Sequence, residues 1–155
     1  MPIACPFCDP AILAAIYAET ERCRAIYNRA PLVDGHSLIV PKRHATRLGD
    51  LSPGEWTELF GLARRMALLL MPAYGCDGYD LSLQEGASAG QTMAHLHLHI
   101  VPRRPGDLPH DDWHAQLLDS ALRRRLSPDE MARHVARLRA MGGAAGGRAT
   151  PPPAP

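Results

Sequence analysis

The strongest constraint on the fold is the segment 95–101, His-Leu-His-Leu-His-Ile-Val. Strict alternation of polar and apolar residues is typical of a strand with one face in the core, because successive side chains point to opposite faces. The segment therefore predicts a strand that carries three imidazoles in a row, His95, His97 and His99. Since the whole chain holds only eight histidines, we interpret this row as functional rather than as the polar face of a half-exposed strand.

Helix starts are marked by two copies of the pattern Ser-Pro-x-Glu, at Ser52 and at Ser127. Serine at the cap and glutamate three residues later satisfy free N–H groups of the first turn, and proline fits the first helical position. The first helix is predicted to run to just before Pro72, with apolar residues every three or four positions. A second helix follows Ser127, and a short one is expected over residues 10–18 with Asp9 as its cap.

Four strand-like segments flank the first helix, at residues 22–28, 36–40, 79–85 and 95–101. Strands grouped in pairs around a long helix favour an antiparallel sheet over alternating βαβ units. Asp34-Gly35 lies between the first two segments and suits a hairpin, because glycine tolerates positive φ. The predicted fold class is therefore α+β.

Length and composition bound the number of domains and the kinds of partner. A chain of 155 residues, 46% of them apolar, can bury a core without a metal or disulfides. A net charge of +1 argues against extended nucleic-acid binding, and no apolar stretch is long enough for a membrane span. The N-terminus lacks a secretory signal, so a cytoplasmic location with reduced cysteines is expected. We predict one folded domain, 1–141, and a disordered tail, 142–155, rich in Gly, Ala and Pro.

The loop 84–92, Gln-Glu-Gly-Ala-Ser-Ala-Gly-Gln-Thr, leads directly into the histidine row. Its backbone N–H groups, amides and hydroxyl form a donor set suited to phosphate oxygens. Two functions of the row remain open on the residues alone: the imidazoles bind a catalytic metal, or one neutral imidazole acts as a nucleophile. The run Arg123–Arg125 is interpreted as a solvated surface.

Cys5-Pro-Phe-Cys8 is the second motif with chemical meaning. Two thiolates separated by two residues fit one tetrahedral zinc ion, but redox pairs share this spacing. Nothing around the motif resembles a thioredoxin unit, and two free cysteines are the simplest alternative. A zinc site would need two further ligands.

Over residues 5–107 the chain resembles the histidine triad family of nucleotide hydrolases and transferases. The matching segments are the histidine row, Gly90-Gln-Thr, Gly35-His36-Ser-Leu-Ile-Val-Pro-Lys-Arg-His44 and Asn28-Arg-Ala-Pro31. The resemblance implies a homodimer and an antiparallel sheet of about five strands with one long helix and shorter ones. Gln84-Glu-Gly together with Gly90-Gln-Thr is similar to the fragile-histidine-triad branch, whose members split dinucleoside polyphosphates.

The same resemblance implies a covalent mechanism centred on His97. This residue would attack the α-phosphorus of a nucleoside polyphosphate, dinucleoside polyphosphate or nucleotide amidate, and water would release a nucleoside monophosphate. His99 would bind the phosphoryl oxygens, His36 would support the row, and His95 completes the triad. The expected contacts with an adenine nucleotide are Asn28, Gln84, Gln91, Thr92, Ile26 and Leu38.

In zinc-carrying bacterial members of the family, the positions that match Cys5, Cys8, His44 and His95 hold the metal. The resemblance thus implies a structural Zn²⁺ and no organic cofactor, and His95 as a ligand could not also act as an acid. The fragile-histidine-triad branch lacks these cysteines, so the chain combines features of two branches. Three alternatives stay open: a phosphorylase or nucleotidyltransferase, a metal-dependent hydrolase with three histidine ligands, and a nucleotide-binding module without turnover.

Overall fold

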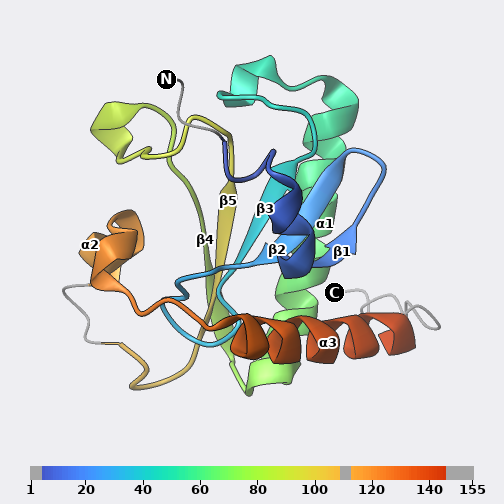
Figure 1. Cartoon of the computed structure of the whole chain (residues 1–155), viewed down its shortest axis with the longest axis vertical. Coiled ribbons are helices and arrows are strands. Elements are labelled where there is room, and N and C mark those ends of the chain that lie inside the picture. The colour runs from blue at the N-terminus through green and yellow to red at the C-terminus, as the bar shows by residue number, and fades with distance from the viewer. Residues whose placement is uncertain (1–4, 109–112, 146–155) are drawn as a thin grey trace, which may run out of the picture.

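A five-stranded antiparallel sheet forms the centre of the molecule (Figure 1). The computed structural model describes residues 5–108 and 113–145. The strands are β1 (Ile16–Glu19), β2 (Cys23–Tyr27), β3 (Ser37–Pro41), β4 (Gly78–Leu83) and β5 (Leu98–Arg103), in the spatial order β1-β2-β3-β5-β4. Every neighbouring pair is antiparallel, which confirms the predicted α+β class.

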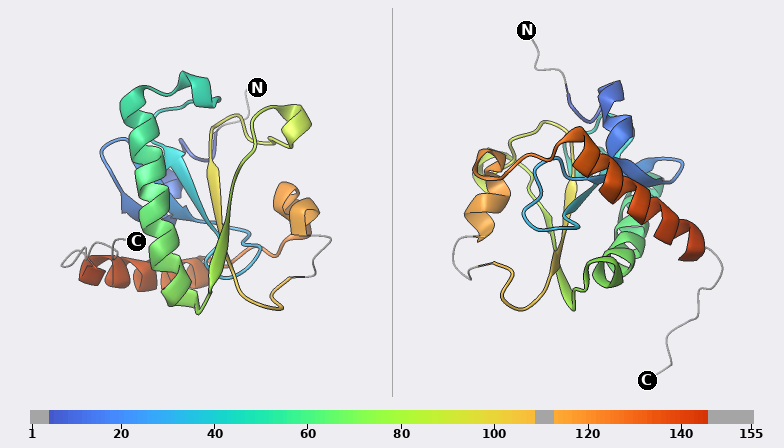
Figure 2. Two further views of the ribbon diagram at one scale, coloured as in Figure 1. Left: turned by 180° about the vertical axis from the view of Figure 1, so that it is seen from behind. Right: turned by 60° about the horizontal axis from the view of Figure 1, so that its bottom comes forward.

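Within residues 5–108 and 113–145, three α-helices and four short 3₁₀ helices complete the fold. They are α1 (Pro53–Tyr74), α2 (Trp113–Leu118), α3 (Pro128–Ala145), η1 (Pro10–Ala15), η2 (Leu48–Asp50), η3 (Ala87–Ala89) and η4 (Ser120–Leu122). Helix α1 covers one face of the sheet, and α3 crosses near one end of α1 (Figure 2). No helix in the described ranges is both long enough and apolar enough to cross a membrane.

The two faces of the sheet bury different apolar clusters. Toward α1, the main core contains Leu59, Leu62 and Leu70 of the helix together with Leu98 and Ile100 of β5. The opposite face carries a smaller cluster, whose members include Phe7, Ile16, Ile26 and Leu38. The pleat therefore sends alternate side chains of β2, β3 and β5 into two separate environments.

Both predicted capping boxes are present. The N–H of Glu55 donates to Ser52 Oγ at 3.2 Å and the N–H of Ser52 donates to Glu55 Oε2 at 2.8 Å. Ser127 and Glu130 repeat the arrangement at 3.2 and 2.8 Å. The reciprocal bonds satisfy the free N–H groups of α1 and α3.

Helix α1 continues through Pro72 to Tyr74, so its predicted end before the proline is wrong. Leu70 and Ala73, on either side of Pro72, are buried against the sheet. Packing thus outweighs the hydrogen bond that proline removes. The helix ends at Gly75, whose φ of 63° is left-handed.

The helix expected over residues 10–18 is shorter than predicted. Asp9 does act as a cap, because its Oδ1 accepts from the N–H of Ala11 at 2.8 Å. The 3₁₀ turn of η1 ends at Ala15, and β1 begins at Ile16, where the backbone pairs with β2. Strand pairing therefore replaces the helical continuation.

The histidine row is strand-like in its alternation but only partly in its hydrogen bonding. Leu96, Leu98 and Ile100 are at most 2% exposed and lie in the main core. The strand β5 nevertheless begins at Leu98, not at His95. Its ladder to β3 stops there because the side chain of His95 bonds the Pro41 carbonyl, while the N–H of Leu96 donates to the Ala45 carbonyl.

The predicted boundary of the folded domain lies within α3. The prediction places the end at residue 141, whereas α3 runs on to Ala145. Residues 146–155 of the predicted tail, and residues 1–4 at the other end, lie outside the described residues. The division of the chain into domain and tail stays a prediction.

Candidate active site and metal-binding cluster

A cavity of about 530 Å³ opens on the face of the sheet opposite α1. Its apolar wall comes from the N-terminal segment, η1 and the sheet, and its polar wall comes from the histidine row, the 84–93 loop and the segment after α2. The described lining includes Phe7, Ile12, Ile26, Asn28, Leu38, Gln84, Thr92, Met93, His97, His99 and Arg123. The strands thus place imidazoles, donors and an apolar wall around one space.

His97 presents a neutral imidazole with one nitrogen free. Its Nδ1 lies 2.8 Å from the His95 carbonyl oxygen, which can only accept, so Nδ1 carries the proton. Nε2 therefore keeps its lone pair. The side chain is 8% exposed, and burial lowers the pKa of His97 below its usual value. A neutral ring with an unprotonated nitrogen at a cavity is the form that can attack an electrophile.

His99 receives its protonation state through His36. The N–H of Leu32 donates to His36 Nδ1 at 3.0 Å, which places the proton of a neutral His36 on Nε2. His36 Nε2 then donates to His99 Nδ1 at 2.9 Å, which places the proton of a neutral His99 on Nε2. His36 is fully buried and does not line the cavity, whereas His99 does. The row therefore contains an acceptor nitrogen on His97 and a donor nitrogen on His99.

Both rings of this pair are held in the neutral form. Burial, the His99 ring and the Arg123 charge lower the pKa of His36. Burial, the His97 ring and the Arg123 charge lower the pKa of His99 to about 3. At neutral pH both rings are therefore present as neutral imidazoles, each with one donor and one acceptor nitrogen.

The six predicted substrate contacts are not all placed alike. Asn28, Ile26, Leu38, Gln84 and Thr92 line the cavity, whereas Gln91 is not among its lining residues. The Gln91 side-chain oxygen accepts from the N–H of Gly86 at 2.7 Å. Its Nε2 donates to the carbonyls of Thr46 and Met93, each at 3.1 Å. In this arrangement Gln91 fixes the shape of the loop that carries Thr92.

Asn28 stands beside the buried histidine. Its Oδ1 accepts from the N–H of Ala30 at 3.0 Å, and its Nδ2 lies 3.3 Å from His36 Nε2. The side chain is 8% exposed and reaches the cavity wall at the end of β2. The bond from Ala30 holds the amide in one orientation, whereas the Nδ2 contact adds no hydrogen bond because His36 Nε2 donates its proton to His99.

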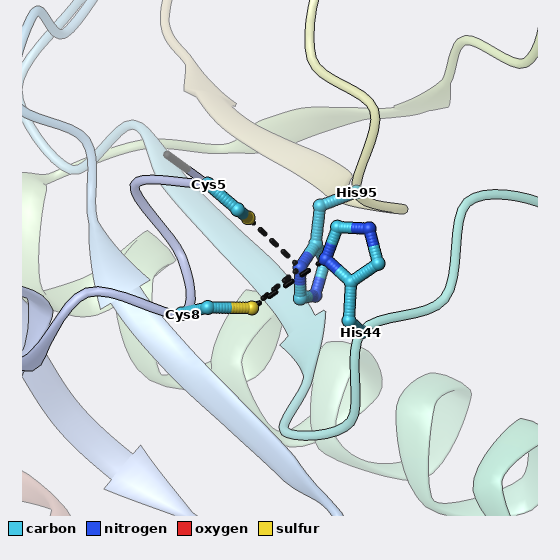
Figure 3. Close-up of side chains that lie close together, drawn as sticks. All are labelled: Cys5, Cys8, His44 and His95. Carbon is cyan, nitrogen blue, oxygen red and sulfur yellow. Dashed lines mark hydrogen bonds between the residues drawn. The ribbon is translucent and has the colours of Figure 1, made fainter. Parts of the chain in front are cut away.

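The side chains of Cys5, Cys8, His44 and His95 point toward one another (Figure 3). Cys5 Sγ lies 3.3 Å from His95 Nδ1, and Cys8 Sγ lies 3.5 Å from His44 Nδ1 and 3.6 Å from His95 Nδ1. A tetrahedral zinc ion with Zn–S near 2.3 Å and Zn–N near 2.0 Å places sulfur and nitrogen ligands about 3.5 Å apart. The spacing of the four residues therefore fits one zinc ion.

The tautomer of His95 also suits metal binding. Its Nε2 lies 3.0 Å from the Pro41 carbonyl, so Nε2 carries the proton and Nδ1 offers its lone pair to the cluster. A ligating histidine that donates its other N–H to a backbone carbonyl is the usual outer-shell arrangement of metal sites. His95 is not a lining residue of the cavity, so its imidazole faces the cluster and not the predicted substrate.

The three imidazoles of the row do not converge on one point. His95 faces the cysteines, the Nδ1 of His97 faces a backbone carbonyl, and the Nδ1 of His99 faces His36. In the described part of the chain, the residues able to hold a metal together are the two cysteines with His44 and His95. This geometry does not support the alternative of a metal-dependent hydrolase with three histidine ligands.

Sequence reasoning missed two residues that border the site. Phe7 lies between the two cysteines, and its ring centroid is 5.4 Å from those of both His95 and His97. Arg123, interpreted as solvated, is half-buried at the cavity, with Nη1 3.3 Å from His36 Nδ1. The sequence carries no signal for this placement, because the three arginines of the run are identical, whereas in the structure Arg123 and Arg125 line the cavity and Arg124 pairs with Glu130 at 2.9 Å.

A second cavity, of about 480 Å³, offers less chemistry. It is lined by residues near the end of α1, among them Tyr74 and Arg137. The Tyr74 hydroxyl is bonded to His134 Nδ1 at 3.0 Å, and Arg137 donates to the Ala73 carbonyl. The side chains of Tyr74 and Arg137 are therefore already engaged within the protein.

Comparison with known proteins gives a consistent set of matches. The HIT domain model matches residues 10–106. The chain is 32% identical over 112 residues to a bis(5'-nucleosyl)-tetraphosphatase (asymmetrical) of Schizosaccharomyces pombe, with 72% of this chain and 62% of that protein covered. It is 37% identical over 97 residues to a bis(5'-adenosyl)-triphosphatase of Dictyostelium discoideum, with 63% and 65% covered. The matches thus span less than two thirds of either relative's length.

A solved structure extends the likeness over nearly the whole chain. The crystal structure of a Zn-bound histidine triad family protein from Mycobacterium smegmatis superposes with a TM-score of 0.67 and 29% sequence identity. The superposition covers 91% of this chain and 97% of that one.

Proposed function

The chain belongs to the HIT domain family, and on this premise we propose that it is a nucleotide hydrolase that cleaves at an α-phosphorus through a covalent nucleotidyl-His97 intermediate. The substrate class is a nucleoside polyphosphate, a dinucleoside polyphosphate or a nucleotide amidate, and the product is a nucleoside monophosphate. The observation that carries the proposal is the neutral His97 ring, whose Nδ1 is bonded to a backbone carbonyl at 2.8 Å so that Nε2 is free at the cavity. The relatives named as a tetraphosphatase and a triphosphatase support it.

In the first step, His97 Nε2 forms a bond to the α-phosphorus while the bond from phosphorus to the leaving group breaks. The leaving group departs with the electron pair of that bond, as a phosphate oxyanion when the substrate is a polyphosphate and as a neutral amine when it is an amidate whose nitrogen has taken a proton from solvent. In the second step, water forms a new P–O bond and loses a proton to solvent. The P–N bond breaks, and its electron pair returns to Nε2.

His99 and the loop supply donors to the phosphoryl group. The proton on His99 Nε2 is available to a non-bridging oxygen, because Nδ1 is engaged with His36. Gln84 and Thr92 line the same cavity and add neutral donors. Preorganised donors of this kind stabilise charge that develops on the transferred phosphoryl group.

The apolar wall of the cavity fits a nucleobase. Ile26 and Leu38 lie there in the cluster on the sheet face opposite α1, and Asn28 stands at its polar end, within reach of a ribose. We assign these three residues to the nucleoside portion of an adenine nucleotide.

Cys5, Cys8, His44 and His95 are the proposed ligands of a structural Zn²⁺. The fit of the four ligand atoms and the tautomer of His95 support this assignment, as does the zinc-bound mycobacterial structure. Bound there, the metal would cross-link the N-terminal segment to the start of the histidine row. Phe7, which packs on His97, would thereby be held at the cavity wall.

The proposed partner of the chain is a second copy. Strand β4 forms an edge of the sheet, and its Tyr79 and Leu81 are 47% and 43% exposed. On α1, Trp56 and Leu68 are exposed as well. Pairing through β4 and α1 would cover this apolar surface and protect the edge strand. A single-chain mass in sedimentation equilibrium at micromolar concentration contradicts the homodimer.

The proposed location is the cytoplasm. Cys5, Cys8, Cys23 and Cys76 form no disulfide with one another. Thiolate ligands of a zinc site require reduced cysteines, which a reducing compartment maintains. Zinc and free-thiol content of protein isolated under anaerobic conditions tests this, and a Cys5–Cys8 disulfide contradicts it.

The test of the mechanism is to trap the intermediate. The protein is mixed with diadenosine triphosphate, quenched within milliseconds and analysed by mass spectrometry, and we expect an adenylyl adduct on the peptide that contains His97. His97→Ala should lack both the adduct and turnover while keeping the thermal midpoint of the wild type. Turnover that persists in a clean preparation of this variant refutes the assignment. Products formed with and without inorganic phosphate separate a hydrolase from a phosphorylase.

A further inference from the structure

The segment between α2 and α3 brings an arginine into the cavity from outside the matched domain. The HIT domain model ends at residue 106, whereas Arg123 follows η4. Leu117 of α2 is buried, and the N–H of Leu126 donates to the Arg29 carbonyl at 2.9 Å. The side chain of Leu118 lies 2.7 Å from the position of a Cβ on Gly90, so the segment packs closely against the loop. The position of Arg123 is therefore fixed on both sides.

The guanidinium of Arg123 has more hydrogen-bonding capacity than the protein uses. Its Nη1 lies 3.3 Å from His36 Nδ1, and its Nε is buried without a partner. Arg123 is absent from the ion pairs of the described residues. A buried guanidinium nitrogen without an acceptor is costly, and it indicates a ligand that supplies one.

The cavity wall, like Arg123 itself, is positively charged. Its described lining contains three arginines, Arg29, Arg123 and Arg125, and a single carboxylate, Asp9. The Asp9 carboxylate is occupied at the start of η1, where it accepts from the N–H of Ala11. One phosphoryl group at His97 carries too little negative charge to balance three guanidinium groups, whereas a chain of phosphates can do so.

We propose that Arg123 binds the phosphate chain of the leaving group and so selects polyphosphate nucleotides over amidates with an uncharged leaving group. This inference rests on the proposed nucleotide hydrolase activity and narrows its substrate class. Arg125 lines the same cavity two residues further along the chain, and its positive charge adds to that of Arg123 around the phosphates.

The test compares Arg123→Gln with Arg124→Gln. Arg124 is the matched control, because it belongs to the same run but is exposed and paired with Glu130. The measurement is the ratio of kcat/KM for diadenosine triphosphate to kcat/KM for adenosine 5'-phosphoramidate. We expect Arg123→Gln to lower this ratio about tenfold or more, as loss of a charge-assisted contact predicts. Arg124→Gln should leave the ratio and both rates within about twofold of the wild type.

Arg123→Lys keeps the charge but loses the planar fork, so its ratio should lie between those of the wild type and Arg123→Gln. An equal fall of both rates in Arg123→Gln overturns the proposal, because Arg123 would then act through His36 on every substrate alike. An unchanged ratio overturns it as well.

A binding measurement separates this inference from the proposed activity. Calorimetric titration of the wild type and both glutamine variants with inorganic tripolyphosphate requires no turnover. If the wild type hydrolyses no nucleotide, the proposed function fails, yet weaker tripolyphosphate binding in Arg123→Gln alone still supports the anion site. Equal binding by all three proteins overturns it. Thermal midpoints of the variants show that the comparison is made on folded protein.

Discussion

Protonation of His99 should make the protein sensitive to acid in a way that one substitution can remove. Burial, more than any neighbouring charge, lowers the pKa of His99 to about 3, against an ordinary value of 6.5. A histidine with a lowered pKa in the folded state binds its proton more readily in the unfolded state. The unfolding free energy therefore falls as the pH drops below 6.5 and continues to fall until the pH reaches the folded pKa.

The size of the effect follows from the two pKa values. Each unit of difference corresponds to about 1.36 kcal/mol, so between pH 7 and pH 4.5 His99 alone should lower the unfolding free energy by roughly 2 to 3 kcal/mol. His99→Asn removes the titrating group and keeps an oxygen that can accept from His36 Nε2, where His99 Nδ1 now accepts at 2.9 Å. The variant should therefore lose roughly 2 to 3 kcal/mol less than the wild type over this interval.

Urea unfolding of both proteins at pH 7 and pH 4.5 measures this difference. The cysteine and histidine cluster is present in both proteins and cancels in the comparison. His36 is present in both as well, but the His99 ring lowers its pKa, so the measured difference reports His99 together with its effect on His36. Circular dichroism at pH 7 establishes that the variant is folded. Equal losses in the two proteins would refute the view that His99 is kept neutral by burial.

Two further predictions concern the N-terminal cluster and one glycine. Removal of zinc by a chelator should lower the unfolding free energy by about 4 kcal/mol, relative to free zinc at a thousandfold its dissociation constant. Cys8→Ser should reproduce that loss and Cys76→Ser should not, and a zinc-free wild type of full stability contradicts the site. Gly35 has a φ of 89°, and a Cβ there would lie 2.6 Å from the Tyr74 ring. Gly35→Ala should therefore lower the unfolding free energy measured in urea by about 3 kcal/mol. Gly75→Ala is the control and should lower it by about 1 kcal/mol, because φ is 63° there but the space around the Cβ is open. Equal losses would show that the Tyr74 ring moves aside at Gly35.

The sequence predicted the framework well because its signals are local. The Ser-Pro-x-Glu boxes at Ser52 and Ser127 are read within one turn, and both form as expected. Alternation over 95–101 identified which side chains enter the core. Boundaries failed where distant packing decides them, as at Pro72, where α1 continues because its last turn is buried against the sheet.

The sequence predicted which residue types form the candidate site, but not which neighbours each of these side chains contacts. Alternation places His95 and His97 on one side, yet nothing local indicates that one turns to the cysteines and the other to the cavity. The place of Gln91 depends on the carbonyl of Thr46, far away in the chain. The role of Arg123 depends on a segment that folds back over the sheet, which its charge run alone does not reveal.

The main-chain groups that bond His36, His95 and His97 have a consequence for how such a protein can diversify. In each of these rings a carbonyl or an amide of the polypeptide itself fixes the tautomer, and at His36 the Arg123 guanidinium faces the same nitrogen as the Leu32 amide. Mutation can replace a carboxylate or a hydroxyl, but it cannot delete a peptide group. The tautomers of these imidazoles therefore follow from the backbone conformation. The side chains that line the cavity can be substituted, and the choice of ligand altered, without changing these main-chain bonds.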